Sequence, residues 1–146
     1  MKRTAKAQWR GDLQSGTGTI SSASGVLSNT PYSYKTRFEQ GNGTNPEELL
    51  AAAHAGCFSM ALSAILQGEG LKADSIETTC TVSLEKEGDG FAIKSSHLDL
   101  TANIPGATQE VFDRVTNAAK EGCPVSKLFD TEISLTAKLE AKAQTA

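Results

Sequence analysis

The 146-residue chain has no lysine or arginine between Phe38 and Leu71. Elsewhere its 14 basic and 17 acidic residues are intermixed, which gives a net charge of −3 without any basic block. Aromatic residues are also scarce, at 5% of the chain. Nucleic-acid binding needs clustered basic residues, and single-strand binding also needs stacking rings. These shortages exclude nucleic acid as an expected partner.

Cysteine is rare as well, with only Cys57, Cys80 and Cys123 in the whole chain. An odd number of cysteines argues against a structural disulfide framework. The amino terminus is basic but lacks the apolar stretch of a signal peptide. We therefore expect a cytoplasmic protein whose thiols are reduced at rest. The length predicts a single domain over 1–146 with a core of its own.

The longest apolar run, 49–66, lies inside the segment without basic residues. It is long enough to raise the possibility of a membrane span. However, it contains His54, Ser59 and Ser63, and it follows glutamates instead of basic anchors. A buried helix of a soluble protein is the better interpretation, with no membrane partner. One small sheet cannot cover a helix that is apolar nearly all round, which favours a dimer.

Alternation, capping residues and glycine stops predict the order of elements. Antiparallel strands interrupted by two helices indicate an α+β fold and not a parallel doubly wound sheet. We expect strands at 4–10, 16–21 and 32–39, a helix from the Asn45 cap to about 67, strands at 76–85 and 91–104 with a bulge near Ser95 and Ser96, a helix from the Thr108 cap to Gly122, a helical turn from Cys123, and a last strand at 133–139.

On a helical wheel, Glu47, His54 and Cys57 fall on one side of the first helix and Glu48 on the opposite side. Glu48 is therefore expected to complete a capping box with Asn45. Glu47 can act as a first-turn partner of the helix dipole or share a pocket with Cys57.

Cys57 can be an inert core residue or a reactive thiol. Reactivity requires the thiolate, which an apolar environment and the Glu47 carboxylate would both oppose. A guanidinium between the two groups would remove this conflict. Arg37 is the last basic residue before the helix and is the candidate. The alternative is that Arg37 is an ordinary exposed arginine on a strand.

Three further groups have both a functional and a structural interpretation. His54 can act as a base, or it can be a neutral histidine packed at a helix interface. His54, Cys57 and Cys123 could together bind zinc, but their spacing fits no common zinc motif. Cys80 alternates with core-facing strand residues and is expected to be a small hydrophobic residue.

Cys123 follows Gly122 and precedes Pro124, so it can cap a helix. Helix N-termini lower thiol pKa values, which makes Cys123 the more acidic cysteine on local sequence alone. Two distant cytosolic cysteines at helical positions suit a transient disulfide, in which one thiolate is oxidised to a sulfenic acid and the other resolves it. Local sequence leaves open which cysteine does which.

Two segments resemble the signature of the OsmC/Ohr family of thiol peroxidases. The first is the long helix motif from Gly43 to Leu62, and the second is Cys123-Pro124-Val125-Ser126-Lys127. The order of elements also matches over nearly the whole chain. The approach at 36–39 and the spelling of the helix resemble the OsmC branch more than the Ohr branch.

The resemblance implies an intertwined cytoplasmic homodimer, in which antiparallel sheets from both chains wrap two central helices. It implies reduction of organic hydroperoxides, and more weakly of hydrogen peroxide, under oxidative and osmotic stress. Cys57 would be the peroxidatic thiol and Cys123 the resolving one. Arg37 and Glu47 would be the activating pair, with Arg10 or Arg3 as the alternative arginine.

The resemblance implies no metal, flavin or nucleotide cofactor. A lipoyl protein, thioredoxin or a small dithiol would return the electrons. Two other functions are compatible with the residues alone. One is a non-catalytic dimeric domain that binds an apolar small molecule between its helices, and the other is a redox sensor that passes its disulfide to a partner.

Overall fold

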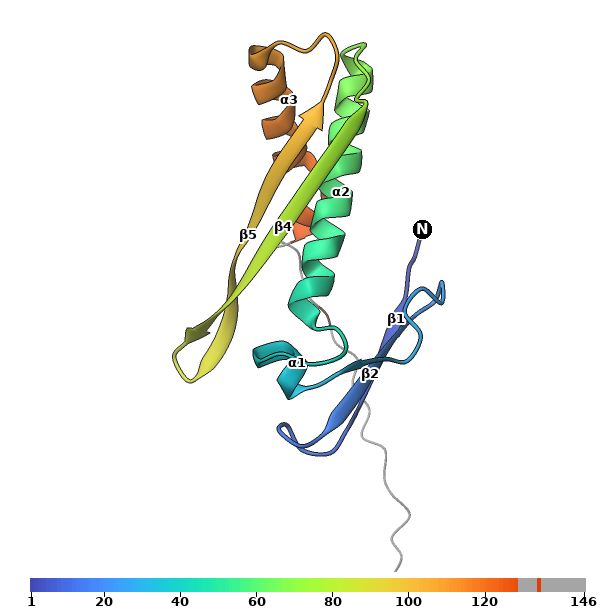
Figure 1. Cartoon of the computed structure of the whole chain (residues 1–146), viewed down its shortest axis with the longest axis vertical. Helices are drawn as coiled ribbons and strands as arrows, with labels where there is room; N and C mark the ends of the chain where they lie inside the picture. Colours follow the sequence, from blue (N-terminus) through green and yellow to red (C-terminus); the bar gives the residue numbers. More distant parts are fainter. Residues whose placement is uncertain (129–133, 135–146) are drawn as a thin grey trace, which may run out of the picture.

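A computed structural model describes residues 1–128 and 134 of the chain. The described part contains two antiparallel sheets, two long helices and two short ones, which confirms the predicted α+β class. The long helix α2 is the axis of the molecule, and the first sheet lies at its amino-terminal end (Figure 1). The predicted strand at 133–139 lies outside the described residues.

The first sheet has the order β1-β2-β3, with β1 at Ala5–Arg10, β2 at Thr17–Ser22 and β3 at Thr30–Tyr32. The first two strands match the prediction. Gly18 lies between the rings of Trp9 and Tyr32, where a Cβ atom would come within 2.6 and 2.5 Å of ring carbons. Only glycine fits there, and the two rings pack with centroids 5.4 Å apart.

The predicted strand over 32–39 is wrong beyond its first residue, because the short helix α1 occupies Tyr34–Phe38. Ser33 caps this helix: its hydroxyl accepts from the Thr36 N–H, and the Thr36 hydroxyl accepts from the Ser33 N–H at 2.8 Å. This reciprocal capping box overrides the alternating pattern. Arg37 is therefore on a helix and not on a strand.

Helix α2 spans Pro46–Gly68, as predicted. The Asn45 side chain caps it by accepting from the Glu48 N–H at 2.8 Å. The Glu48 carboxylate accepts from the Thr44 hydroxyl at 2.9 Å, whereas the predicted capping box had it accept from the Asn45 backbone. The buried residues of α2 follow one stripe: Glu47, His54, Phe58, Leu62 and Leu66. The wheel separation of Glu47 from the exposed Glu48 is confirmed.

By length and composition alone, α2 could cross a membrane, with a mean hydropathy of 1.8 in its most apolar window. Its buried stripe, however, packs against the rest of the chain as the core helix of a globular domain does. Other apolar residues of α2 face outward in the single chain, and the side chain of Met60 is 77% exposed.

Strands β4, Ser75–Glu87, and β5, Gly90–Asn103, form a long hairpin that lies along α2. The pairing shifts where Ser83 faces Ser95 and Leu84 faces Ile93, which leaves Lys94 as the extra residue. This irregularity is within one residue of the predicted bulge. The turn of the hairpin reaches α1, where the rings of Phe38 and Phe91 pack with centroids 5.0 Å apart.

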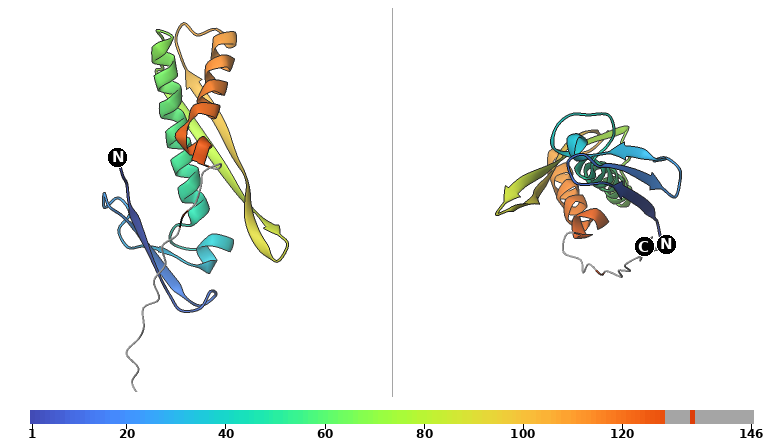
Figure 2. Two further views of the ribbon diagram at one scale, coloured as in Figure 1. Left: turned by 180° about the vertical axis from the view of Figure 1, so that it is seen from behind. Right: turned by 90° about the horizontal axis from the view of Figure 1, so that it is seen from below.

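Helix α3, Gln109–Gly122, runs beside α2, and the short helix α4, Pro124–Leu128, follows it directly (Figure 2). Thr108 caps α3 as predicted, by accepting from the Val111 N–H at 3.2 Å. The hairpin packs against α2 through β4. The buried core between these layers consists of Phe58, Leu62, Leu66, Val115, Ala119 and Cys123.

Leu62 is completely buried in this core. We expect Leu62→Ala to lower the free energy of unfolding by about 2–5 kcal/mol, because it removes buried apolar contacts and leaves a cavity. Urea unfolding followed by circular dichroism measures the change. Val26→Ala is the matched control, since Val26 is 86% exposed and should have little effect. Equal effects of the two variants would contradict this assignment of the core.

Candidate active site

Two of the three cysteines meet where α2 passes the junction of α3 and α4. Cys57 lies half-buried in the middle of α2, and Cys123 is fully buried between α3 and α4. The two thiols are in hydrogen-bond contact and are both unoxidised. Two distant segments of the chain thus bring the predicted pair of thiols together.

The fold gives the two thiols different acidities. Burial raises the pKa of Cys57, and its hydrogen bond with Cys123 raises it further. Burial also opposes ionisation of Cys123, but hydrogen bonds from Cys57, from the Ser126 and Val125 amides and from the Ser126 hydroxyl lower its pKa overall. These amides belong to the start of α4, where Cys123 has the predicted capping position. Within one chain, Cys123 is therefore the more acidic thiol.

Arg37 and Glu47 form the second predicted pair. The guanidinium donates from Nε at 3.0 Å and from Nη2 at 2.9 Å, both to Oε1 of Glu47. The helix α1 is held against the start of α2 by a second bond, from the Asn45 amide to the Thr36 carbonyl at 3.2 Å. The Glu47 side chain is 11% exposed and that of Arg37 39% exposed. The expected contact between Arg37 and Glu47 is therefore present.

Within one chain, the Arg37–Glu47 pair is separated from the thiols. Glu47 and Cys57 lie ten residues apart on α2, which corresponds to about 15 Å along the helix axis. Arg37 is bound at Glu47, and it is not among the groups that shift the pKa of Cys57. The other oxygen of Glu47, Oε2, is buried and has no hydrogen-bond partner among the described residues.

Neither of the alternative arginines, Arg3 and Arg10, is among the groups that shift the pKa of Cys57 or Cys123. Arg3 donates to the Lys2 carbonyl at 3.1 Å, and Arg10 ends β1 opposite Thr17. The activating role of Arg37 stays a prediction, because it needs a contact with Cys57 that a single chain does not make.

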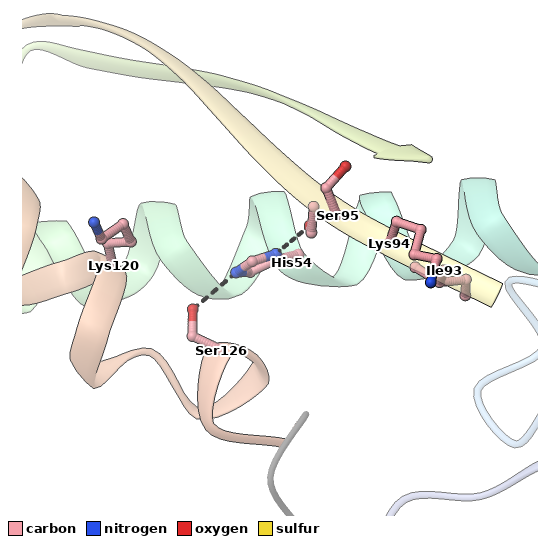
Figure 3. A pocket seen from close by; sticks show the side chains of 7 residues that line it. His54, Ile93, Lys94, Ser95, Lys120 and Ser126 are labelled. Atoms are coloured by element: carbon pink, nitrogen blue, oxygen red, sulfur yellow. Dashed lines mark hydrogen bonds between the residues drawn. The ribbon is translucent and has the colours of Figure 1, made fainter. Parts of the chain in front are cut away.

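His54 is buried between β5 and α4. Its Nδ1 atom lies 2.6 Å from the Ser96 hydroxyl and its Nε2 atom 2.8 Å from the Ser126 hydroxyl. Figure 3 shows the imidazole extending from α2 between these two elements. His54 is therefore packed at an interface, and both of its ring nitrogens have polar partners, which is compatible with either interpretation of this residue.

The prediction that Cys80 is a small core hydrophobic residue is only partly correct. Its thiol is half-buried, but Sγ lies 3.1 Å from the Ser96 hydroxyl and 3.9 Å from Nδ1 of His54. Neither Ser96 nor Ser126 was a predicted site residue. Ser126 stands three residues after Cys123, which is the local signal that could have identified it. Among the described residues, no three side chains of histidine, cysteine, aspartate or glutamate gather closely enough to hold a metal ion.

The chain is similar to known proteins over nearly its whole length. The family model for "OsmC-like protein" matches residues 39–138. The chain is 48% identical over 139 residues to the peroxiredoxin OsmC of Escherichia coli K12, covering 95% of this chain and 97% of the relative. It is 34% identical over 140 residues to the organic hydroperoxide resistance protein OhrB of Bacillus subtilis, with the same coverage. The predicted resemblance to the OsmC branch is confirmed.

Solved structures agree with these sequence matches. The crystal structure of Bacillus subtilis OhrB superposes with a TM-score of 0.61 at 34% identity, covering 85% of this chain and 88% of that one. An OsmC-like protein from Mycoplasma pneumoniae has a TM-score of 0.67 at 13% identity, which shows the fold alone. Sequence, fold and the long helix motif are in agreement, and the chain belongs to the OsmC-like protein family.

Proposed function

We propose that this protein is a thiol-dependent peroxidase that reduces organic hydroperoxides, and hydrogen peroxide more weakly, in the cytoplasm. The observation that carries the proposal is the contact between the Cys57 and Cys123 thiols inside an apolar core. The identity to the peroxiredoxin OsmC supports the same activity.

The chemistry has two steps on the protein. The Cys57 thiolate attacks one peroxide oxygen, the O–O bond breaks, and the alkoxide takes up a proton to leave as an alcohol. Cys57 is now a sulfenic acid. The Cys123 sulfur then attacks Cys57, an S–S bond replaces the S–O bond, and water leaves. A dithiol such as a lipoyl protein, thioredoxin or a small dithiol restores both thiols by exchange.

Cys57 is the first nucleophile in this scheme, although one chain makes Cys123 more acidic. A second copy of the chain would remove this disagreement by placing an arginine side chain beside Cys57, because a nearby positive charge lowers the pKa of a thiol. The outward apolar residues of α2, such as Met60, and the exposed strand β1 support a homodimer in which they are covered. In that dimer, each Arg37 would stay bound to Glu47 of its own chain. The Arg37 guanidinium of one subunit would then lower the pKa of Cys57 in the other subunit and orient the peroxide.

The surroundings of Cys57 support a preference for alkyl hydroperoxides. Cys57 and Ala61 both pack against the buried core that contains Phe58 and Leu62. An alkyl group gains free energy when it leaves water for such a surface, by about 25 cal/mol for each Å² that is buried. Hydrogen peroxide has no apolar group and gains nothing from this contact.

Replacing Cys123 with serine tests the assigned roles. The variant should consume at most one equivalent of cumene hydroperoxide per chain and then stop, because nothing resolves the sulfenic acid on Cys57. Mass spectrometry after trapping with a sulfenic-acid reagent locates the oxidised sulfur. Oxidation at Cys80 with an unmodified Cys57 would reject the assignment. Turnover of the variant at the wild-type rate in the presence of a dithiol would also reject it.

A further inference from the structure

His54 connects the resolving cysteine to a surface pocket. Its imidazole is one of the lining groups of a cavity of about 550 Å³, together with Ser96, Ser126, Lys94 and Lys120. Both lysines are exposed, so the pocket opens to water. Figure 3 shows Lys120 from α3 and Lys94 from β5 at the ends of this pocket. None of these groups takes part in the proposed bond changes at Cys57 and Cys123.

Ser126 links this histidine to the thiols. Its hydroxyl is 2.8 Å from Nε2 of His54, and the same hydroxyl is hydrogen-bonded to Cys123. A hydroxyl has one proton to donate and can accept at the same time. When Cys123 is a thiol, its S–H can donate to Ser126 while the Ser126 O–H donates to Nε2. Cys123, Ser126 and His54 then form a continuous path for a proton.

The second ring nitrogen fixes the tautomer that this path needs. If Nδ1 carries the proton and donates to the Ser96 hydroxyl at 2.6 Å, Nε2 is left as an acceptor facing Ser126. Burial lowers the pKa of His54, so the imidazole is neutral and able to accept at neutral pH. The titratable side chains that face the ring from the neighbouring elements include Cys80, Lys94 and Lys120, and none of these three is a carboxylate.

We propose that His54 is a positioning residue for the resolving step, which accepts the proton of Cys123 through Ser126 as Cys123 attacks the sulfenic acid. The electron pair of the Cys123 sulfur forms the S–S bond, and the S–O bond of Cys57 breaks with its pair on oxygen. The Cys123 proton moves to Ser126 while the Ser126 proton moves to His54. The leaving hydroxide takes a proton from solvent, His54 releases one to the pocket, and water is the net product.

The inference rests on the proposed peroxidase function, and its test separates the two steps. One equivalent of cumene hydroperoxide is mixed with the full-length protein, and rapid-quench mass spectrometry follows the sulfenic acid and then the disulfide. We expect His54→Gln and Ser126→Ala to form sulfenic acid at close to the wild-type rate. Each should slow disulfide formation by about a hundredfold. The double variant should be no slower than the single ones, because both interrupt one path.

The pH dependence distinguishes a proton acceptor from a merely structural residue. In the wild type, the rate of disulfide formation should fall in acid with an inflection below about pH 6.5, where His54 becomes protonated. In His54→Gln this inflection should disappear, leaving only the ionisation of Cys123 at higher pH. A loss of packing alone would lower stability but would not remove the inflection.

Ser59→Ala is the matched control, because it also deletes a half-buried hydroxyl, one that bonds the Ala55 carbonyl and the Thr78 hydroxyl away from the thiols. It should leave disulfide formation unchanged. If His54→Gln fails to fold, Ser126→Ala still tests the proposed proton path. Wild-type rates and a wild-type pH profile in Ser126→Ala would overturn the role of His54 while leaving the peroxidase intact. A wild-type protein that loses no thiol to the peroxide would overturn both.

Discussion

Cys57→Ser will reduce peroxide consumption by at least about a thousandfold, equivalent to about 4 kcal/mol of activation free energy. A serine hydroxyl does not ionise at neutral pH, so it cannot replace the thiolate as nucleophile. Cys57 is also the residue that contacts the resolving thiol of Cys123. The measurement is the loss of cumene hydroperoxide in the presence of a dithiol. The three possible reductant classes are compared in the same assay.

Cys80→Ser is the matched control for this result. Cys80 is the third thiol of the chain and lies on β4, near Ser96 and His54 but without a recorded bond to Cys57. The variant should keep at least about half of the wild-type rate, since serine can preserve the bond to Ser96. If Cys57→Ser keeps full activity and Cys80→Ser loses it, the active thiol has been assigned to the wrong cysteine.

Arg37→Ala is expected to impair both chemistry and stability. Without the guanidinium, the pKa of Cys57 should rise, and the peroxidase rate at pH 7 should fall about tenfold or more. The buried Glu47 would also lose its partner. Breaking a buried pair costs about 3–5 kcal/mol, but the Arg37 side chain is 39% exposed, so we expect about 1–3 kcal/mol.

Two measurements separate these effects. The rate of Cys57 alkylation against pH, read site by site by mass spectrometry, reports the thiolate, and urea unfolding reports stability. Arg10→Ala is the control, because Arg10 is an exposed arginine at the end of β1. If Arg10→Ala shifts the alkylation profile and Arg37→Ala does not, the activating arginine is Arg10.

Local signals predicted most of the helices correctly. Asn45 and Pro46 at the start of α2, and Thr108 before α3, are strong start signals because the capping bonds form within a few residues. The same physics explains the error at 32–39. Ser33 and Thr36 form a capping box with two hydrogen bonds. These bonds stabilise a helix more than the alternating pattern at 32–39 stabilises a strand.

The parts of the candidate site that lie on or next to one helix, α2, were predictable from the sequence. The wheel brought Glu47 to the buried face of α2, and the Gly-rich loop before it allowed Arg37 to fold back. The contacts of His54 were not predictable, because its partners Ser96 and Ser126 come from β5 and α4. Long-range pairing of that kind depends on the register of the hairpin, which a periodicity alone does not give.

The structure also changes how the absence of basic residues around Cys57 is understood. Arg37 lies on α1 and contacts the first turn of α2. It binds Glu47 there, about 15 Å along the helix axis from Cys57. If the proposed homodimer supplies the guanidinium, reactivity at Cys57 depends on assembly as well as on folding. We expect a dissociated chain to have an ordinary or poorly reactive thiol there, since burial raises its pKa.

The pairing of the thiols is the central claim, and one titration tests it most directly. Wild-type protein is mixed with one equivalent of cumene hydroperoxide per chain, and free thiols and disulfides are identified by mass spectrometry. The predicted result is the loss of two of the three thiols, with a Cys57–Cys123 disulfide inside one chain and Cys80 still reduced. Three intact thiols after complete mixing, or a disulfide that includes Cys80, would contradict it.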